Sequence, residues 1–226
     1  MMPEGDLSAE ELDPAALERF VPPSARHILV CGENAGPLVR ALQTRGGVEV
    51  AQFPDAPQPG DAPIEAAALP FTDDYFACIA AADFLPRLRD PEPVLRELRR
   101  VLAPEGLLVA TAPNVQCYRT VFLLAEGRWT YASTGILARR NVRFFTGVDL
   151  AETISAAGFE MRSLSSLVLA APESVPRNAD GYIASGRVRI GPLNDTEYQL
   201  YRTHQFVALA GKAKPADGPP GGPGRP

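Results

Sequence analysis

The chain has 226 residues, which is enough for one α/β domain with a substantial core and leaves little for a second domain. Hydrophobic residues make up 46% and charged residues 22%, an ordinary composition for a soluble globular protein. The formal net charge of −5 argues against a broad basic surface, so we do not expect a nucleic-acid-binding protein. No apolar run approaches the ~18 residues that suggest a membrane span, so no span is expected.

The cysteines and the first residues bear on the compartment. The three cysteines are odd in number and show no C-x-x-C spacing; Cys31 and Cys78 lie in apolar runs. We therefore expect buried thiols rather than reactive ones, and no metal site. The opening residues, MMPEGD, lack the charged-then-apolar pattern of a signal peptide. These features favour the reducing cytoplasm.

The first quarter of the chain indicates a helix followed by a β-α-β unit. Ser8 and Glu11 form a capping-box pattern, which predicts a short helix to about Phe20. Residues 1–24 are therefore expected to form an N-terminal helix and linker. The next patterns predict a buried strand, an amphipathic helix and a second strand, at residues 27–31, 37–44 and 48–53. Such a unit predicts a parallel sheet with a right-handed crossover.

Further elements follow from proline placement and apolar periodicity. The prolines of residues 54–63 predict a loop, because a proline inside a helix costs ~3 kcal/mol. Residues 91–102 are predicted as a helix with Pro91 in its first turn, and Thr146 as the cap of a helix to about residue 157. The remaining apolar runs predict strands at residues 64–68, 75–82, 106–112, 159–170 and 201–210.

Two segments are predicted to lack regular structure. Residues 171–194, rich in proline, glycine and asparagine, form a long connection that is either functional or partly disordered. Residues 212–226 (KAKPADGPPGGPGRP) are expected to be a flexible tail that buries nothing.

The densest pattern in the chain is residues 69–114, LPFTDDYFACIAAADFLPRLRDPEPVLRELRRVLAPEGLLVATAPN. It resembles the second half of class I S-adenosylmethionine (SAM)-dependent methyltransferases of the type 11 and type 23 groups, where the usual wording is LPF…FD…LEH…DP…L.E..RVL.PGG…PN. The resemblance implies a Rossmann-like three-layer αβα sandwich over residues 25–211. It also implies a seven-stranded, mostly parallel sheet in the order 3-2-1-4-5-7-6 with an antiparallel last strand, and SAM as the cofactor.

The turn after the first strand is where the resemblance implies cofactor contacts. ILVCGENAG (residues 28–36) lies over the family's ILDLGCGTG wording. Gly32 and Gly36 keep the first and last glycines, which permit a tight turn and a close approach of backbone to ligand. Glu33 lies between them, and Asn34 replaces the middle glycine. A plain strand-to-helix turn would explain the glycine pair nearly as often.

Three further places on the cofactor side follow from the resemblance. Asp55 lies close to the family's ribose-binding acid, although a turn residue in a proline-rich loop explains it equally well. Glu65 takes the position of the acid that receives the adenine amino group, with the Ala66 amide at the ring edge; a solvated glutamate is the alternative. Ala81, Ala82 and Asp83 are expected to line the pocket beneath the sulfonium.

The acceptor side departs from the family at its polar positions. The acid of "FD" is Ala77, and the Glu-His of "LEH" is Pro86-Arg87. Arginine cannot serve as a base. Of the two histidines, His27 begins the first strand at the wrong end for the site, and His204 is more consistent with a structural residue.

Residues 113–159 resemble a subgroup with the wording PN…LLLGR..Y…GILDRTHLRFFT…L..LL..AGF, which is common in bacterial operons for polysaccharides and other envelope glycans. Residues 114–145 would then form a lid over the acceptor. Its arginines could bind a phosphate or carboxylate or form a solvated face, and its aromatic rings could stack on a sugar or pack internally. The residues expected to contact the acceptor are Arg87, Asn114, Tyr118, Trp129 and Asn141.

Two functional hypotheses remain open. The first is a SAM-dependent methyltransferase acting on a small-molecule or glycan-linked acceptor. The second is a methyltransferase-fold protein that has lost catalysis and serves as a binding or partner subunit, with a protein partner or as a homodimer. A nucleotide-dependent dehydrogenase is disfavoured, because the phosphate-binding Gly-x-Gly-x-x-Gly pattern is missing from the sequence.

Overall fold

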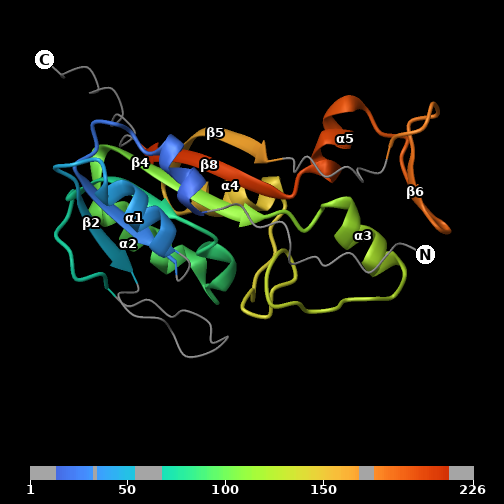
Figure 1. Cartoon of the computed structure of the whole chain (residues 1–226), viewed down its shortest axis with the longest axis horizontal. Coiled ribbons are helices and arrows are strands. Elements are labelled where there is room, and N and C mark those ends of the chain that lie inside the picture. Colours follow the sequence, from blue (N-terminus) through green and yellow to red (C-terminus); the bar gives the residue numbers. More distant parts are fainter. Residues whose placement is uncertain (1–13, 33–34, 54–67, 168–175, 214–226) are drawn as a thin grey trace, which may run out of the picture.

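The structure is a computed structural model that describes residues 14–32, 35–53, 68–167 and 176–213 (Figure 1). Its main sheet has six strands, of which only β8 runs antiparallel to its neighbours. Across the sheet, the strands are β2 (Glu49–Phe53), β1 (His27–Cys31), β3 (Phe76–Ala81), β4 (Leu102–Pro113), β8 (Gln205–Lys212) and β5 (Phe159–Leu167).

This order confirms the predicted topology for the strands that the structure describes. The predicted strand at residues 64–68 lies outside the described residues, as does the proline-rich stretch before it. The main sheet of the described part therefore has six strands rather than seven. Their order is the predicted one. The last strand of the chain, β8, is inserted antiparallel between β4 and β5.

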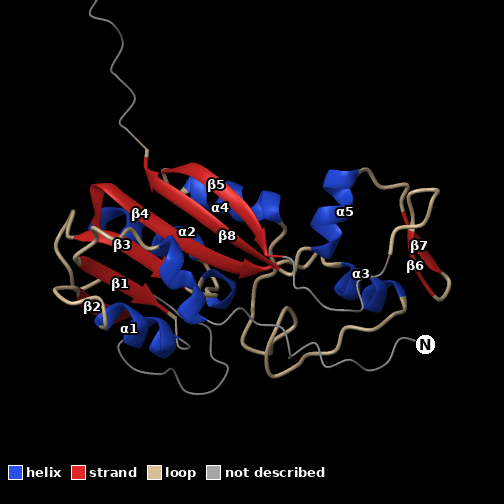
Figure 2. Cartoon of the chain, turned by 45° about the horizontal axis from the view of Figure 1, so that its top comes forward, coloured by secondary structure: helices blue, strands red, loops and turns tan. Residues whose placement is uncertain are grey.

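Helices cover both faces of this sheet, which confirms the three-layer sandwich (Figure 2). Strand residues alternate between two buried clusters, so that Leu29 faces one cluster and Val30 the other. On one face lie α2 (Pro91–Val101) and α4 (Gly147–Ala156). On the other lie α1 (Gly36–Gln43) and the short 3₁₀ helix η1 (Pro14–Phe20).

The two helices of the first face begin and end as the sequence predicts. Asp90 caps α2 by accepting a hydrogen bond from the Glu92 amide at 3.3 Å, and Val94, Leu95, Leu98 and Val101 are buried on its inner face. Thr146 caps α4 through a capping box with Asp149. Gly158, at φ +88°, ends that helix in the left-handed region, which glycine adopts without strain.

A second, smaller core lies beyond the carboxyl ends of the parallel strands (Figures 1 and 2). We call residues 114–145 and 176–204 the cap lobe. The buried residues of its hydrophobic cluster are Cys117, Tyr118, Phe122, Ile136, Leu137 and Ile183. Its elements are α3 (Tyr118–Ala125), the hairpin of β6 (Ile183–Ser185) and β7 (Val188–Ile190), and α5 (Asp195–Arg202).

Two predictions about this region are wrong. Residues 171–194 are not simply a loop, because they contain the β6-β7 hairpin. The last strand begins at Gln205 rather than at residue 201, because Asn194 and Glu197 form a capping box that starts α5 and carries it to Arg202.

The remaining predictions concern the chain's ends. The predicted capping box at Ser8 and Glu11 lies outside the described residues, and the described part of that helix is 3₁₀ rather than α-helical. Strand β8 continues to Lys212, one residue into the predicted tail, and residues 214–226 lie outside the description. No helix among the described residues is long and apolar enough to cross a membrane.

Candidate functional site

The candidate site lies at the carboxyl end of β1. This strand is the switch point of the sheet, because β2 pairs with it on one side and β3 on the other. In open α/β sheets, ligands bind outside the carboxyl ends of the strands at this switch point. Gly32 follows β1 at φ +122°, and its amide donates to the Phe53 carbonyl at 3.0 Å. A Cβ at this position would lie 2.6 Å from the Ala82 carbonyl oxygen. The turn therefore requires glycine, as the sequence predicts.

The close approach joins the two predicted cofactor segments that the structure describes. The Ala82 amide donates to the Cys31 carbonyl at 3.1 Å, which holds the end of β3 against the end of β1. Gly36 begins α1, where a Cβ would meet only the flexible side chain of Arg40 at 3.3 Å. Gly32 and Ala82 are thus in contact, and Gly36 starts the helix that follows.

The other predicted cofactor residues lie outside the described residues. These are Glu33, Asn34, Asp55, Glu65 and Ala66. Their roles stay predictions. The described part of the site is compatible with the adenosyl cofactor, because neither Gly32 nor the small Ala82 carries a bulky side chain at the switch point.

A polar cluster that the sequence did not reveal lies beside this turn. Asp83 adopts φ +46°, a conformation that aspartate tolerates better than most residues. Its Oδ1 accepts hydrogen bonds from Thr111 Oγ1 at 2.9 Å and from Gln205 Nε2 at 2.7 Å. The Asp83 amide in turn donates to Thr111 Oγ1 at 2.9 Å. Asp83 follows β3, Thr111 lies in β4 and Gln205 begins β8, so no local sequence pattern predicts their meeting.

The Leu-Pro-Phe segment is anchored to α2 by an ion pair. Glu97 accepts a hydrogen bond from the Leu69 amide at 3.0 Å, and Arg100 donates to the Leu69 and Phe71 carbonyls at 3.0 and 2.9 Å. The Arg100 guanidinium, and then the Leu69 amide, lower the pKa of the Glu97 carboxyl. Glu97 and Arg100 occupy the charged positions of the L.E..RVL wording, which explains physically why that wording accompanies LPF.

The lid is fixed to the end of β3 through backbone contacts. The 3₁₀ helix η3 (Leu85–Arg87) follows β3, and its Pro86 carbonyl accepts from the Val142 and Arg143 amides at 2.9 and 3.0 Å. Arg143 Nε donates to the Arg89 carbonyl at 2.8 Å. The Arg87 side chain is buried, with 2% of its surface exposed. The structure therefore brings Arg87 and the lid together.

Asn114 and Asn141 are buried, and the structure gives their side chains internal partners. Asn114 Nδ2 donates to the Leu200 and Thr203 carbonyls, both at 2.9 Å. Asn141 Nδ2 donates to the Ile136 carbonyl at 3.1 Å. Both amides hold turns of the cap lobe together, and their predicted contacts with an acceptor stay predictions.

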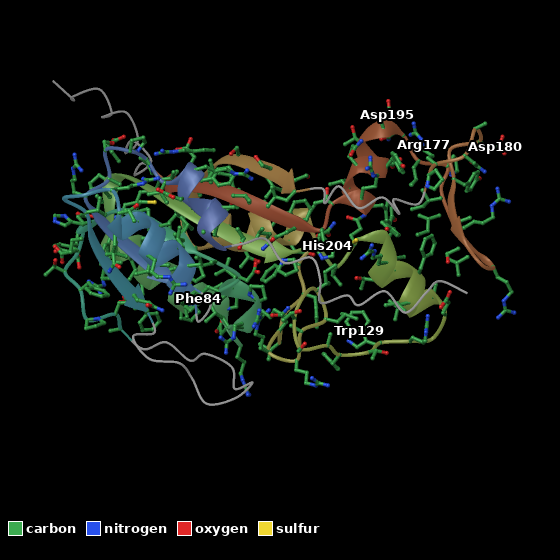
Figure 3. The ribbon with its side chains drawn as sticks, viewed as in Figure 1. Phe84, Trp129, Arg177, Asp180, Asp195 and His204 are labelled. Atoms are coloured by element: carbon green, nitrogen blue, oxygen red, sulfur yellow. The ribbon has the colours of Figure 1, made fainter. Side chains whose placement is uncertain are left out.

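The two aromatic residues predicted to contact the acceptor also have protein partners. Tyr118, at the start of α3, packs edge-to-face on Phe122 with ring centroids 6.1 Å apart. Trp129 lies on the lid (Figure 3) and packs edge-to-face on Phe144 at 5.2 Å. The geometry favours internal packing for Trp129, one of the two alternatives that the sequence leaves open.

The histidines and cysteines agree with their expected structural roles. His27 stacks on Tyr75 at the start of β1, away from the site. His204 is buried where the sheet meets the cap lobe, with Nδ1 3.9 Å from Cys117 Sγ (Figure 3). Burial raises the pKa of Cys78 to about 12. Among the residues that the structure describes, no cluster of His, Cys, Asp or Glu could hold a metal ion.

Comparisons with known proteins agree with this geometry. A family model described as "Methyltransferase domain" matches residues 11–164, more than half of the chain. The chain therefore belongs to the methyltransferase domain family. No curated protein sequence matches the chain.

Solved structures share the fold at low sequence identity. A SAM-dependent methyltransferase from Archaeoglobus fulgidus has a TM-score of 0.53 and 14% identity, covering 88% of this chain and 92% of that chain. One from Aquifex aeolicus has a TM-score of 0.50 and 13% identity, covering 88% of each chain. The [4+2]-cyclase SpnF has a TM-score of 0.50 and 16% identity, covering 88% of this chain and 79% of that chain. These likenesses establish the Rossmann-like methyltransferase fold.

Proposed function

We propose that this protein is a SAM-dependent methyltransferase that acts on a small-molecule or saccharide acceptor. The observation that carries the proposal is the glycine turn at the switch point, where Gly32 lies so close to the Ala82 carbonyl that no side chain fits. Family membership supports methyl transfer in general. SAM, when bound, supplies the activated methyl group.

In this proposal different residues of the chain contact different parts of the cofactor. Gly32 and Gly36 allow the backbone after β1 to approach it, with Glu33 and Asn34 in the same turn. In this proposal Ala82 lies beneath the sulfonium, where a small residue lets the ligand lie on the backbone.

Two carboxylates complete the proposed cofactor site. Glu65 receives the adenine amino group, with the Ala66 amide at the ring edge. Asp55 either accepts hydrogen bonds from the ribose hydroxyls or serves as a turn residue. A carboxylate that accepts hydroxyl donors contributes ~1.5–3 kcal/mol per hydrogen bond, so Glu65→Ala and Asp55→Ala should be separable by affinity.

The proposed acceptor site lies between the end of β3 and the cap lobe. The lid docks on Pro86, and in this proposal it covers the position where the acceptor meets the methyl group. Such positioning is a large part of methyl transfer, which is an in-line displacement. The likeness of residues 113–159 to the glycan-operon subgroup supports a saccharide acceptor in the bacterial cytoplasm. Arg139 and Arg143 are exposed on the lid, whereas Arg128 pairs with Glu126 at 2.8 Å.

A second function, that of a catalytically impaired binding or partner subunit, is favoured by one observation. Two of the residues expected to contact the acceptor have structural roles instead of catalytic ones, since Asn141 holds lid carbonyls and Arg87 is buried and cannot act as a base. The named cyclase activity of SpnF also illustrates that this fold does not determine the reaction.

An isotope experiment separates the two functions. The protein is incubated with SAM carrying a labelled methyl group and with saccharide and small-molecule pools, and the label is followed by mass spectrometry. Label in an acceptor supports the methyltransferase. Binding of SAM by calorimetry without any transferred label favours the partner subunit.

The same calorimetry tests the assignment of the carboxylates. Binding that is abolished in Glu65→Ala and unchanged in Asp55→Ala supports the adenine role and rejects the ribose role. Loss in both variants supports both roles, and no loss in Glu65→Ala contradicts the adenine role.

A further inference from the structure

Asp83 occupies the place where the cofactor turn meets the acceptor side. It follows Ala82, whose carbonyl lies against Gly32, and it precedes the segment on which the lid docks. Its backbone is left-handed, at φ +46°, a conformation that residues other than glycine adopt rarely. Strain of this kind persists where the surroundings enforce it, and it gathers at functional sites.

Two neutral donors fix the Asp83 carboxylate in one orientation. Thr111 Oγ1 and Gln205 Nε2 both donate to Oδ1, at 2.9 and 2.7 Å. Thr111 and Gln205 are themselves buried, with 1% and 5% of their surfaces exposed. Hydrogen bonds to an ionised acceptor are roughly twice as strong as neutral ones, so the pair stabilises the charged form in place.

The antiparallel β8 makes this arrangement possible. Gln205 is the first residue of β8, so it lies at the same edge of the sheet as the ends of β3 and β4. Asp83 and Thr111 come from those two ends. The cluster is therefore a prearranged negative charge at the edge where the proposed methyl transfer takes place.

We propose that Asp83 is a catalytic residue that binds the nitrogen of an amine acceptor, so that the reaction is an N-methylation. The inference rests on the proposed methyl transfer and names the class of its acceptor. Thr111 and Gln205 are positioning residues that act through Asp83.

The chemistry of the displacement favours an amine over a hydroxyl. The amine first loses a proton to water, and its lone pair then forms the nitrogen–carbon bond while the sulfur–carbon bond breaks with its electron pair going to sulfur. Positive charge moves from sulfur to nitrogen, and a fixed carboxylate beside the nitrogen stabilises that charge. The methylammonium product later releases a proton to water. A hydroxyl acceptor would instead need a strong base, and a carboxylate already stabilised by two donors is a weak one.

The variant Asp83→Asn tests the charge with little change in structure. An asparagine side-chain oxygen can still accept from Thr111 and Gln205, so the described hydrogen bonds persist while the charge is removed. The matched control is Asp180→Asn, an exposed aspartate in the cap lobe away from the sheet (Figure 3). Probes come in pairs that differ only at the acceptor atom: phenethylamine with 2-phenylethanol, and glucosamine with glucose.

The expected result is methylation of an amine and not of its hydroxyl partner by the wild-type protein. Asp83→Asn lowers kcat roughly 100-fold, the size of effect seen when one preorganised electrostatic group is removed. It leaves SAM affinity within about twofold, and Asp180→Asn behaves as wild type. Thr111→Val lowers kcat roughly 10-fold or more, as expected for one lost hydrogen bond to a charged group, and Thr111→Ser restores it.

Other outcomes overturn the inference. Methylation of hydroxyl probes alone, of no amine, or of amines equally by wild type and Asp83→Asn would each reject the amine role. Loss of SAM affinity in Asp83→Asn would assign the carboxylate to the cofactor instead. Failure of the wild-type protein to bind SAM is a separate result, because it rejects the proposed function itself.

Discussion

Replacing Gly32 with alanine probes the turn on which the site depends. The new Cβ would lie 2.6 Å from the Ala82 carbonyl oxygen, closer than real Cβ atoms come to backbone, so the ends of β1 and β3 must separate. The φ of +122° adds strain of its own for alanine. Forcing a side chain into a packed site costs ~1–3 kcal/mol and an outlying backbone another ~1–3 kcal/mol, which together give about 4 kcal/mol.

The expected change in melting temperature follows from that sum. For a domain of this size, 1 kcal/mol corresponds to roughly 2–4 °C, so Gly32→Ala should lower the Tm by about 8–16 °C. The matched control is Gly46→Ala, where φ is +61° and nothing lies within 4 Å of the new Cβ. That control costs only the left-handed backbone term, ~1–2 kcal/mol.

Scanning calorimetry or thermal circular dichroism of both variants is the assay. If Gly32→Ala destabilises the protein no more than Gly46→Ala, the contact between the two strand ends is not a tight one. That result would contradict the steric requirement for glycine at position 32. A variant that folds but binds SAM more weakly than the control would support the turn's place in the cofactor site.

Two further predictions concern the framework around the site. Asn114→Ala leaves two carbonyls and one amide without their partner, and it should lower the free energy of unfolding by about 2–5 kcal/mol in denaturant titration. The control Asn178→Ala, at an exposed position, should cost under about 1 kcal/mol. Equal effects of the two variants would contradict the structural role of Asn114. The pKa of Glu97 is lowered in the folded chain by Arg100, so its stabilising contribution is present above its ordinary value of 4.5 and is lost as pH falls through the lower folded value. The Tm difference between wild type and Glu97→Gln should therefore be largest near neutral pH and shrink below pH 4.5; a constant difference would contradict the linkage.

The sequence predicts the sheet and its helices because each of these elements has a local residue pattern that is typical of a strand or a helix. Buried strands such as β1 and β3 are unbroken apolar runs, and α2 has a capping aspartate, a proline in its first turn and one apolar face. Glycine at the end of β1 is predictable for the same local reason, since only glycine adopts that turn. The strand order required the family resemblance, because periodicity does not determine which strands are neighbours.

The elements of the cap lobe and the partners of Asp83 could not be predicted from local residue patterns, for physical reasons. Helix α5 has no buried residue, and β6 and β7 have three residues each, so neither shows a clear apolar period. Only the capping box at Asn194 indicates α5 in the sequence. Asp83 gains its partners from residues 28 and 122 positions away, a meeting that depends on the antiparallel insertion of β8.

The central claim is that this chain binds SAM at the end of β1, and calorimetric titration of the wild-type protein with SAM tests it most directly. We predict saturable heat with one SAM per chain, a similar response to the demethylated product, and weakened binding in Gly32→Ala relative to Gly46→Ala. No heat at millimolar SAM, from protein that melts cooperatively, would contradict the claim.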